Sequence, residues 1–348
     1  MRLRIAREPA CAAVFIAAAA RVFTGVTISL SIHNGAWLAV LLGGLLALPG
    51  LLGLWSAPSV HAFNAGPVRI PAQAFFLLVT LLDCAHLLRC LTDSASYLAL
   101  DQLPPVTLLL PLGAAILWCV FRNGDAIGYS AEVWLRILPL FLLIVLALQF
   151  RSLRPAWLFP LTEGGFKALF SAGLRVSAWQ LIPAASFLLA EDSEESDDRL
   201  SPLRTGITAT AVAASLVVLW QMMVPKLLCP YAETRIGRLD VLLTNGRAPL
   251  YMQLPLILVW FVGLLQTLCF EAFTAAALLQ RLLPGLNGRA AVLSALAAII
   301  AGTRLPGIEA IDARPDGAAV FIAGAILRAT SFTFQTRPRR GSQDSRQP

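Results

Sequence analysis

Ten apolar segments separated by polar loops occupy most of this chain, and polar residues interrupt the sixth segment. That segment, Phe166 to Ala190, contains Ser171 to Gly173 and, further on, Arg175, Gln180 and Pro183. In hydrocarbon, backbone outside a helix is tolerated only where protein buries it or where it lines a cavity. Secondary transporters often build a substrate site from a helix interrupted at mid-membrane. The pattern therefore predicts a membrane protein with a binding site inside the bilayer.

The balance of residue types supports a membrane location. Hydrophobic residues make up 57% of the chain and charged residues 14%, whereas soluble domains carry about 25% charged residues. The net charge of +7 comes almost wholly from arginine, because Lys167 and Lys226 are the only lysines. The arginines lie mainly between apolar segments and form no basic face with interleaved aromatic residues. We therefore interpret them as topology signals rather than as a nucleic-acid surface.

The apolar segments predict an all-α polytopic membrane protein with about ten transmembrane helices, since one span needs about 20 residues. The candidate spans are 10–30, 36–57, 72–100, 106–120, 133–150, 166–190, 207–224, 250–283, 290–302 and 318–334. A cleaved signal peptide is an alternative for the first, because Ala18 to Ala20 resembles a cleavage site. The apolar run continues to Leu30, beyond a typical signal sequence, which favours a retained span.

Arginine is in excess on the side that holds both ends of the chain, so both termini are predicted to be cytoplasmic. The segmentation predicts a single transmembrane domain over residues 1–335 and a disordered cytoplasmic tail over 336–348. The loop Glu191–Asp198 is strongly acidic. It is interpreted as a solvated loop or, alternatively, as a docking segment for a basic partner.

The third span carries charged and polar residues at helical spacing. Asp83, His86, Cys90 and Asp93 lie on one stripe, with Arg89 at its edge. The stripe could pair its charges inside the bundle, or it could form a cavity wall on which Asp83 or His86 accepts a proton. A metal site is disfavoured, because the paired-ligand spacing of zinc sites is missing. No metal or other cofactor is predicted.

Two further charges lie inside predicted spans. Arg21 follows the apolar start of the first span, and Glu271 lies within the eighth. An arginine at this depth needs a partner or water, so we expect Arg21 to pair with Asp83 unless its side chain reaches the interface.

Spans one and six share a small-residue pattern. Phe23 to Gly25 echoes Phe170 to Gly173, and the two spans stand five apart in a count of ten. Matching interruptions in two halves indicate an inverted repeat, here about 10–150 and 166–334, with broken helices 1 and 6. The N-termini of half-helices can hold a substrate carboxylate. The predicted ligand-binding residues are Thr24, Gly25, Val26, Asp83, His86, Ser171, Ala172 and Gly173.

The sequence contains none of the common enzyme motifs. It has no P-loop, GxSxG, HExxH or glycine-rich dinucleotide turn, so no catalytic residue is predicted. The six cysteines form no CxxC pair, and five of them fall in or beside apolar segments, which favours buried thiols over disulfides.

Three stretches resemble the spore-germination permeases, the B subunits of nutrient germinant receptors. They are the first span with the preceding Ile5 to Arg7, the stretch from Leu138 to Gly173 with Pro160 to Gly165 leading into the sixth span, and the eighth span with Trp260. The chain departs from the family at Gln180, where an acidic residue is expected.

The resemblance implies a fold of the amino acid–polyamine–organocation type, a LeuT-like bundle of two inverted five-helix halves. It also implies that the protein binds a small nutrient such as an amino acid and helps to trigger germination. Its partners would be an A-type membrane subunit and a C-type lipoprotein, in the bacterial cell membrane or the spore inner membrane. A secondary amino-acid transporter of the same fold is the alternative.

Overall fold

The regular structure of this chain is helical throughout the part that the computed structural model describes. The described residues are 7–20, 35–55, 69–98, 105–122, 124–149, 155–158, 165–190, 207–208, 210–212, 214–215, 218 and 250–308. Every element within them is a helix, which confirms the predicted all-α class. The acidic loop, the tenth predicted span and the C-terminal tail lie outside these residues.

The helices follow the apolar segments closely, because a backbone in hydrocarbon must satisfy its own hydrogen bonds. They are α1 (Arg7–Ala20), α3 (Ala36–Trp55), α5 (Arg69–Leu98), α6 (Pro105–Arg122), α7 (Gly124–Gln149), the 3-10 turn η2 (Pro155–Leu158), α8 (Gly165–Ala190), α12 (Leu250–Leu282) and α13 (Gly288–Gly302).

Within the described part, two helical stretches are long and apolar enough to cross a membrane: Ile70–Asp93 of α5 and Phe261–Leu282 of α12. A third would be α6 and α7 taken together, whose axes differ by 107° across a short break. The sequence predicted two spans there, with the second beginning at 133, whereas α7 begins nine residues earlier at Gly124. The structure therefore lengthens the fifth predicted helix at its N-terminal end.

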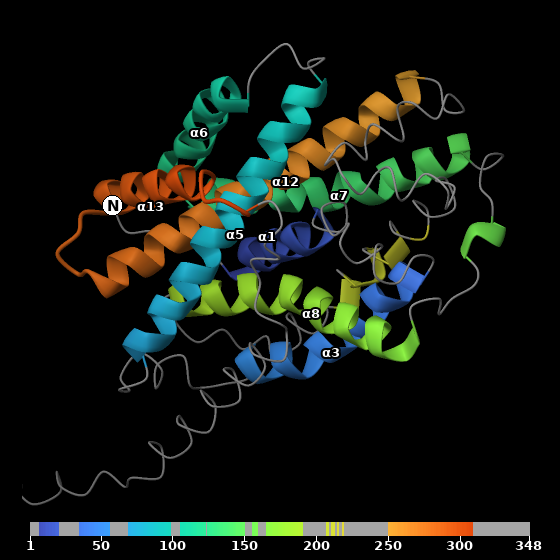
Figure 1. Cartoon of the computed structure of the whole chain (residues 1–348), viewed down its shortest axis with the longest axis horizontal. Helices are drawn as coiled ribbons and strands as arrows, with labels where there is room; N and C mark the ends of the chain where they lie inside the picture. Colours follow the sequence, from blue (N-terminus) through green and yellow to red (C-terminus); the bar gives the residue numbers. More distant parts are fainter. Residues whose placement is uncertain are drawn as a thin grey trace, which may run out of the picture.

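Helix α1 lies in the middle of the bundle and packs against α7, α8 and α12 (Figure 1). Every side chain described in it, from Ala12 to Ala18, is buried. A helix that is apolar on all sides is stable only when it is surrounded. The alanine-rich composition of α1 fits this position, because small side chains let several helices approach one axis.

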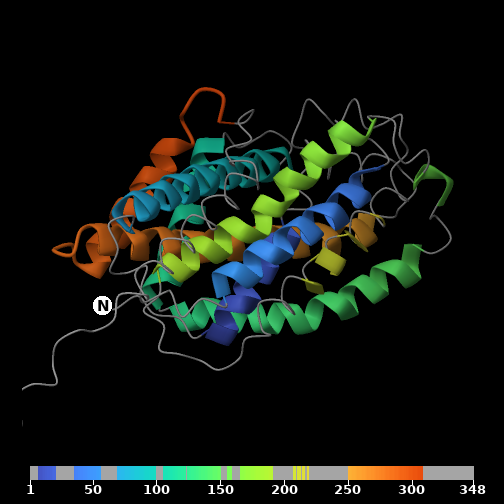
Figure 2. The same cartoon turned by 90° about the horizontal axis from the view of Figure 1, so that it is seen from below.

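Helices α3 and α8 lie side by side in both views of the molecule (Figures 1 and 2). A Cβ added to Gly43 of α3 would lie 2.6 Å from Cβ of Val176 and 2.7 Å from the carbonyl oxygen of Gly173. One added to Gly50 would lie 2.6 Å from Leu181. The residue numbers of the contacting pairs increase together along both helices, so α3 and α8 run parallel. At Gly43 the two backbones nearly touch.

Helix α8 is continuous from Gly165 to Ala190, with Pro183 inside it. The sequence predicted an interruption at Ser171 to Gly173, and this prediction is wrong for the described helix. The small residues there are used for packing: Ala172 and Gly173 are buried on the side that meets α3. The predicted break in the first helix lies outside the described residues.

Helix α13 closes one side of the bundle against α5, α6 and α12. It begins after a short turn that follows α12, where the side chain of Asn287 accepts a hydrogen bond from the Arg289 amide at 3.3 Å. This cap satisfies one of the free N–H groups of the first helical turn. At the other end, a Cβ added to Gly302 would lie 2.8 Å from Ala85 of α5. A glycine is therefore needed where α13 approaches α5.

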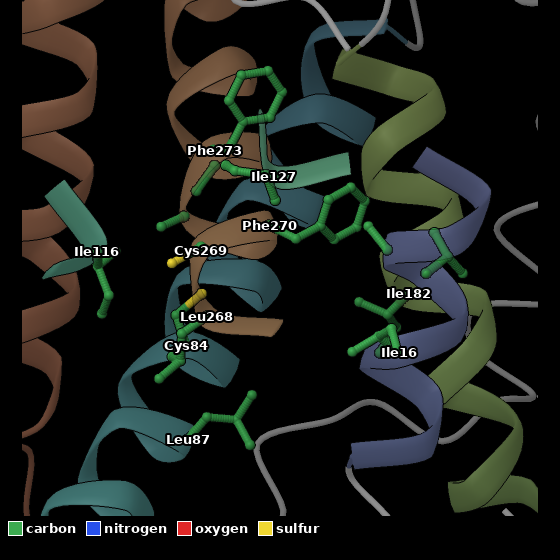
Figure 3. Packing of buried hydrophobic residues seen from close by; sticks show 14 of the residues in the cluster. Ile16, Cys84, Leu87, Ile116, Ile127, Ile182, Leu268, Cys269, Phe270 and Phe273 are labelled. Atoms are coloured by element: carbon green, nitrogen blue, oxygen red, sulfur yellow. The ribbon is translucent and has the colours of Figure 1, made fainter. Parts of the chain in front are cut away.

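The main core lies where α1, α5, α6, α7, α8 and α12 converge (Figure 3), and residues of α3 and α13 add to it. Ile16, Ile182 and Phe270 come from three different helices and meet in this core. Cys84 and Cys269 are buried in the same cluster with free thiols. Buried thiols are what the cysteine pattern predicted.

Candidate functional site

The helices of the three spans that carry the predicted ligand-binding residues come together in the structure with the eighth span, which carries Glu271. Helix α12 packs against α1, α5 and α8, and α8 also contacts α1 and α5. These helices correspond to the first, third, sixth and eighth predicted spans. The sequence could indicate which spans carry polar residues, but only the tertiary contacts place those spans side by side.

The predicted residues of the first span cannot be placed in this site. Thr24, Gly25 and Val26 lie outside the described residues, and so does Arg21. The expected pairing of Arg21 with Asp83 therefore stays a prediction. Asp83 itself is almost fully buried on α5.

The predicted residues of α8 do not make its hydrogen bond to Thr80 of α5. Ser171 is exposed, and a Cβ added to Gly173 would lie 3.0 Å from Leu42 of α3. The contact between α8 and α5 is made instead by Ser186, whose hydroxyl lies 3.0 Å from that of Thr80. Ser186 is 13 residues beyond Gly173, or about 20 Å along a helix. Gly173 thus lies far along α8 from the contact with Thr80.

Two acidic side chains are buried near the contact between α5 and α12. Asp83 of α5 is 1% exposed and Glu271 of α12 is 2% exposed. The thiol of Cys84, next to Asp83 in the chain, donates a hydrogen bond to Oε2 of Glu271 at 3.6 Å. Burying carboxylates in hydrocarbon is costly unless a proton, a cation or hydrogen bonds compensate for the lost water. This contact therefore holds two buried carboxyl groups, which are costly to place in a membrane protein.

The hydroxyl groups near Glu271 donate hydrogen bonds to carbonyl oxygens of their own helix. Thr267 donates to the carbonyl oxygen of Gly263 at 2.8 Å, and Thr274 donates to that of Phe270 at 2.9 Å. Bonds of this kind satisfy a buried hydroxyl within one turn. The two threonines consequently need no ligand, and the carboxyl group of Glu271 is the distinctive feature of this helix face.

His86 connects α5 to the turn after α13. Its Nδ1 lies 2.9 Å from the carbonyl oxygen of Ile308, and its Nε2 lies 3.6 Å from Sγ of Cys90. Because a carbonyl oxygen can only accept, Nδ1 carries the hydrogen and Nε2 accepts from the thiol. Both ring nitrogens are therefore engaged within the protein, which favours a structural role over the predicted ligand contact.

The other residues of the α5 stripe also have local partners. Nε of Arg89 donates to Oδ2 of Asp93 at 2.8 Å, one helical turn away. This pairing agrees with the interpretation that the stripe neutralises charge within the bundle. Among the residues that the structure describes, no three His, Cys, Asp or Glu side chains are placed to share a metal ion.

Glutamine side chains form part of the polar structure that the sequence analysis did not resolve. Gln180 donates through Nε2 to the hydroxyl of Thr210 at 2.7 Å. Gln266 of α12 accepts from Ser130 at 2.8 Å and donates to the carbonyl oxygen of Ile127 on α7. Gln73 is buried on α5. A polar side chain inside an apolar run is a visible signal in the sequence, but it does not reveal whether a partner exists.

Comparisons with known proteins identify the fold. A scan against protein-family models and a search of curated proteins give no match. Among solved structures, the chain is similar to Mhp1, a nucleobase-cation-symport-1 family transporter in a closed conformation with bromovinylhydantoin bound. The TM-score is 0.65 at 11% identity, over 94% of this chain and 76% of Mhp1.

A second similar structure is the Eremococcus coleocola manganese transporter, with a TM-score of 0.50 at 12% identity over 94% of this chain and 76% of that one. Both are membrane transporters of the LeuT-like fold. The chain is therefore an integral membrane protein with this fold, as the sequence predicted. At such identities the likeness concerns the fold alone.

Proposed function

We propose that this protein is a permease-type membrane protein that binds a small polar nutrient, such as an amino acid, inside the bilayer. The observation that carries the proposal is the burial of Asp83 and Glu271 near the contact of α5 with α12, in a transporter fold. The binding site lies between α5, α8 and α12, together with the predicted residues of the first span. No enzymatic activity is assigned to the chain.

A buried carboxyl group in this position can bind a cationic group and release it again. A solute ammonium group, a proton or a metal cation would each neutralise the carboxylate and lower the cost of its burial. Loading and release of such a group would favour different arrangements of the helices. An amino acid supplies an ammonium group, so it fits a site with buried acids.

The fold likeness supports a small solute without specifying it. One similar protein was solved with a hydantoin, and the other is a manganese transporter. Proteins of this fold thus accept chemically different cargoes. The nutrient class proposed here rests on the buried carboxyl groups and on the sequence resemblance, and not on either neighbour.

The second candidate is a sensing role in spore germination, in complex with an A-type membrane subunit and a C-type lipoprotein. The stretch Leu138–Gly173 and the eighth span favour this candidate, because they carry the resemblance to germinant-receptor B subunits. A sensor and a transporter can share one site, since a ligand that binds two conformations unequally shifts their populations without being pumped.

Uptake by purified protein tests the proposal. The full chain is reconstituted in liposomes, and uptake of a labelled amino-acid mixture is followed with and without a proton or sodium gradient. Gradient-driven accumulation that Glu271→Gln abolishes is the result expected of a transporter. Binding without accumulation, again lost in Glu271→Gln, is expected of a sensor. Wild-type protein that neither binds nor accumulates any of the mixture would overturn both candidates.

Deletion in the native cell separates the two candidates further. Loss of a sensor slows germination in response to the nutrient and leaves uptake by growing cells unchanged. Loss of a transporter lowers uptake and leaves germination unchanged.

A further inference from the structure

Gln73, near the beginning of α5, is buried, and its amide has no hydrogen-bond partner among the residues that the structure describes. The residue is 1% exposed, and this lack of a partner holds for both Oε1 and Nε2. A buried primary amide without partners loses its bonds to water and gains nothing in return. Such groups are rare in folded proteins, and each one calls for an explanation such as a bound ligand or water.

Two other glutamines of the same protein show how an amide is normally satisfied here. Both amide atoms of Gln266 are bonded, to Ser130 and to the Ile127 carbonyl. Gln180 uses its Nε2 on Thr210, although its Oε1 has no partner. The three residues therefore form a series in which both, one or none of the amide atoms are bonded. Gln73 is the extreme case.

Gln73 lies on the same helix face as Thr80, another buried polar residue of α5. It precedes Thr80 by seven residues, a spacing that places both on one side of an α-helix. Thr80 is hydrogen-bonded to Ser186 of α8, so this side faces the bundle interior. Phe75 and Leu78 are exposed and mark the outer side. The amide of Gln73 thus belongs to the interior face.

The position of Gln73 is distinct from the acidic contact. Asp83 is ten residues further along α5, which corresponds to about 15 Å. One small solute cannot reach both groups at once. Gln73 lies toward the N-terminal end of α5, the end that the arginine distribution predicts to be cytoplasmic.

We propose that Gln73 is the recognition residue of a second solute station, near the N-terminal end of α5. Its Oε1 accepts a hydrogen bond from an N–H of the solute, and its Nε2 donates to a solute oxygen. The chemistry recognised is an N–H donor and an oxygen acceptor on neighbouring atoms, as in an amino acid or a cyclic imide. The inference rests on the proposed function, because it treats this station as a stop for the same solute.

The amide is left without partners because its partner is the solute, which is absent when the station is empty. The protein is then less stable without solute than it would be with an apolar residue at this position. Such a cost is common where a residue is kept for binding rather than for stability. This reasoning gives a test that does not depend on knowing the solute.

The first experiment measures the thermal unfolding of the purified full chain without solute, by tryptophan fluorescence. Methionine resembles glutamine in length and lacks its amide. Gln73→Met is expected to raise the unfolding temperature by about 2 °C or more, since it removes an unsatisfied buried amide. The matched control Gln266→Met is expected to lower it, since both amide atoms of Gln266 are bonded. A lower temperature for both variants would overturn the proposal.

The second experiment adds probes to the same proteins. L-alanine and uracil represent the two solute types, and 1,3-dimethyluracil lacks the N–H donors. We expect wild type to be stabilised by L-alanine or by uracil, but not by the methylated compound. Gln73→Met should weaken the apparent affinity at least about tenfold, while Gln266→Met should not. Equal affinity in wild type and Gln73→Met would overturn the second station and leave the proposed function standing. A wild type that responds to neither probe would overturn the second station, whereas the proposed function is judged by the amino-acid mixture.

Discussion

The α3–α8 contact and the α5–α12 contact differ in chemical character: glycines line the first, and buried acidic side chains lie near the second. Between α3 and α8, Gly43 and Gly173 let two backbones touch. Between α5 and α12, the thiol of Cys84 donates a hydrogen bond to Glu271. Small residues drive close helix packing in membranes, whereas intramembrane acids mark sites of function. The first contact serves helix packing, and the second carries the carboxyl groups on which the proposed function rests.

This difference matters because the sequence analysis assigned a binding role to α8 residues that the structure uses for packing against α3. Small and polar residues in the sixth span were interpreted as a binding site, yet Gly173 meets Leu42 of α3. A glycine in a membrane helix can mark either an unwound segment or a close contact with another helix. The residue type alone does not distinguish the two. The variants below test this division, beginning with the largest expected effect.

Gly43→Leu should have the largest effect, and it acts on folding. Even the first side-chain atom would lie 2.6 Å from Val176 and 2.7 Å from the Gly173 carbonyl oxygen. Overpacking of this kind costs about 1–3 kcal/mol or more. We expect little monodisperse protein after detergent extraction, as judged by size-exclusion chromatography. Gly285→Leu is the control, since nothing lies within 4 Å of a Cβ there. Normal yield of Gly43→Leu would show that α3 and α8 are not in this contact.

Glu271→Gln should affect function strongly and folding little. Glutamine keeps the size of the side chain and an oxygen that can accept from Cys84, but it removes the charge. We expect solute binding to weaken at least about tenfold, which is about 1.4 kcal/mol. Equilibrium binding and thermal unfolding are measured on the same preparation. Unchanged binding, or a loss of binding that merely follows a loss of stability, would remove Glu271 from the site.

Gly173→Ala should have an intermediate effect that a second substitution reverses. The new methyl group would lie 3.0 Å from Cδ2 of Leu42, the end of a flexible side chain. We expect a loss of about 1 kcal/mol, and recovery in the double variant with Leu42→Ala. A denaturation series on the four proteins measures this coupling. If Gly173→Ala abolished solute binding at full stability, with no rescue by Leu42→Ala, the original site assignment would be restored.

Thr80→Val and Ser186→Ala should have the smallest effects. Their hydroxyls are joined by one hydrogen bond of 3.0 Å between α5 and α8. A double-mutant cycle should return a coupling of about 0.5–1.5 kcal/mol. A coupling of zero would mean that α8 and α5 are held together by apolar packing alone.

The sequence predicted the class of the fold with some precision. Long apolar runs determined the helices, and the bounds of α5, α8 and α12 lie within a few residues of those predicted. The reason is local: a run of apolar residues in a bilayer has only the helix as a way to satisfy its backbone. The order and spacing of the runs also suggested the LeuT-like arrangement that the structural comparison supports.

The candidate site was only partly predictable. Asp83 and Glu271 stand out in the sequence because a carboxyl group inside an apolar run is expensive. His86 stood out for the same reason, yet the structure engages it with Ile308 and Cys90. The isolated amide of Gln73 could not be recognised, because the sequence does not show which polar atoms lack partners.

The sequence by itself determined that this chain is a helical membrane protein with a few costly polar groups. Transfer of each segment into hydrocarbon depends on that segment's own residues. Tertiary structure alone decided that Gly173 packs against α3, that Cys84 contacts Glu271, and that Gln73 is left unsatisfied. Each of these depends on which helix faces are opposed across large sequence separations, and no local pattern contains that information.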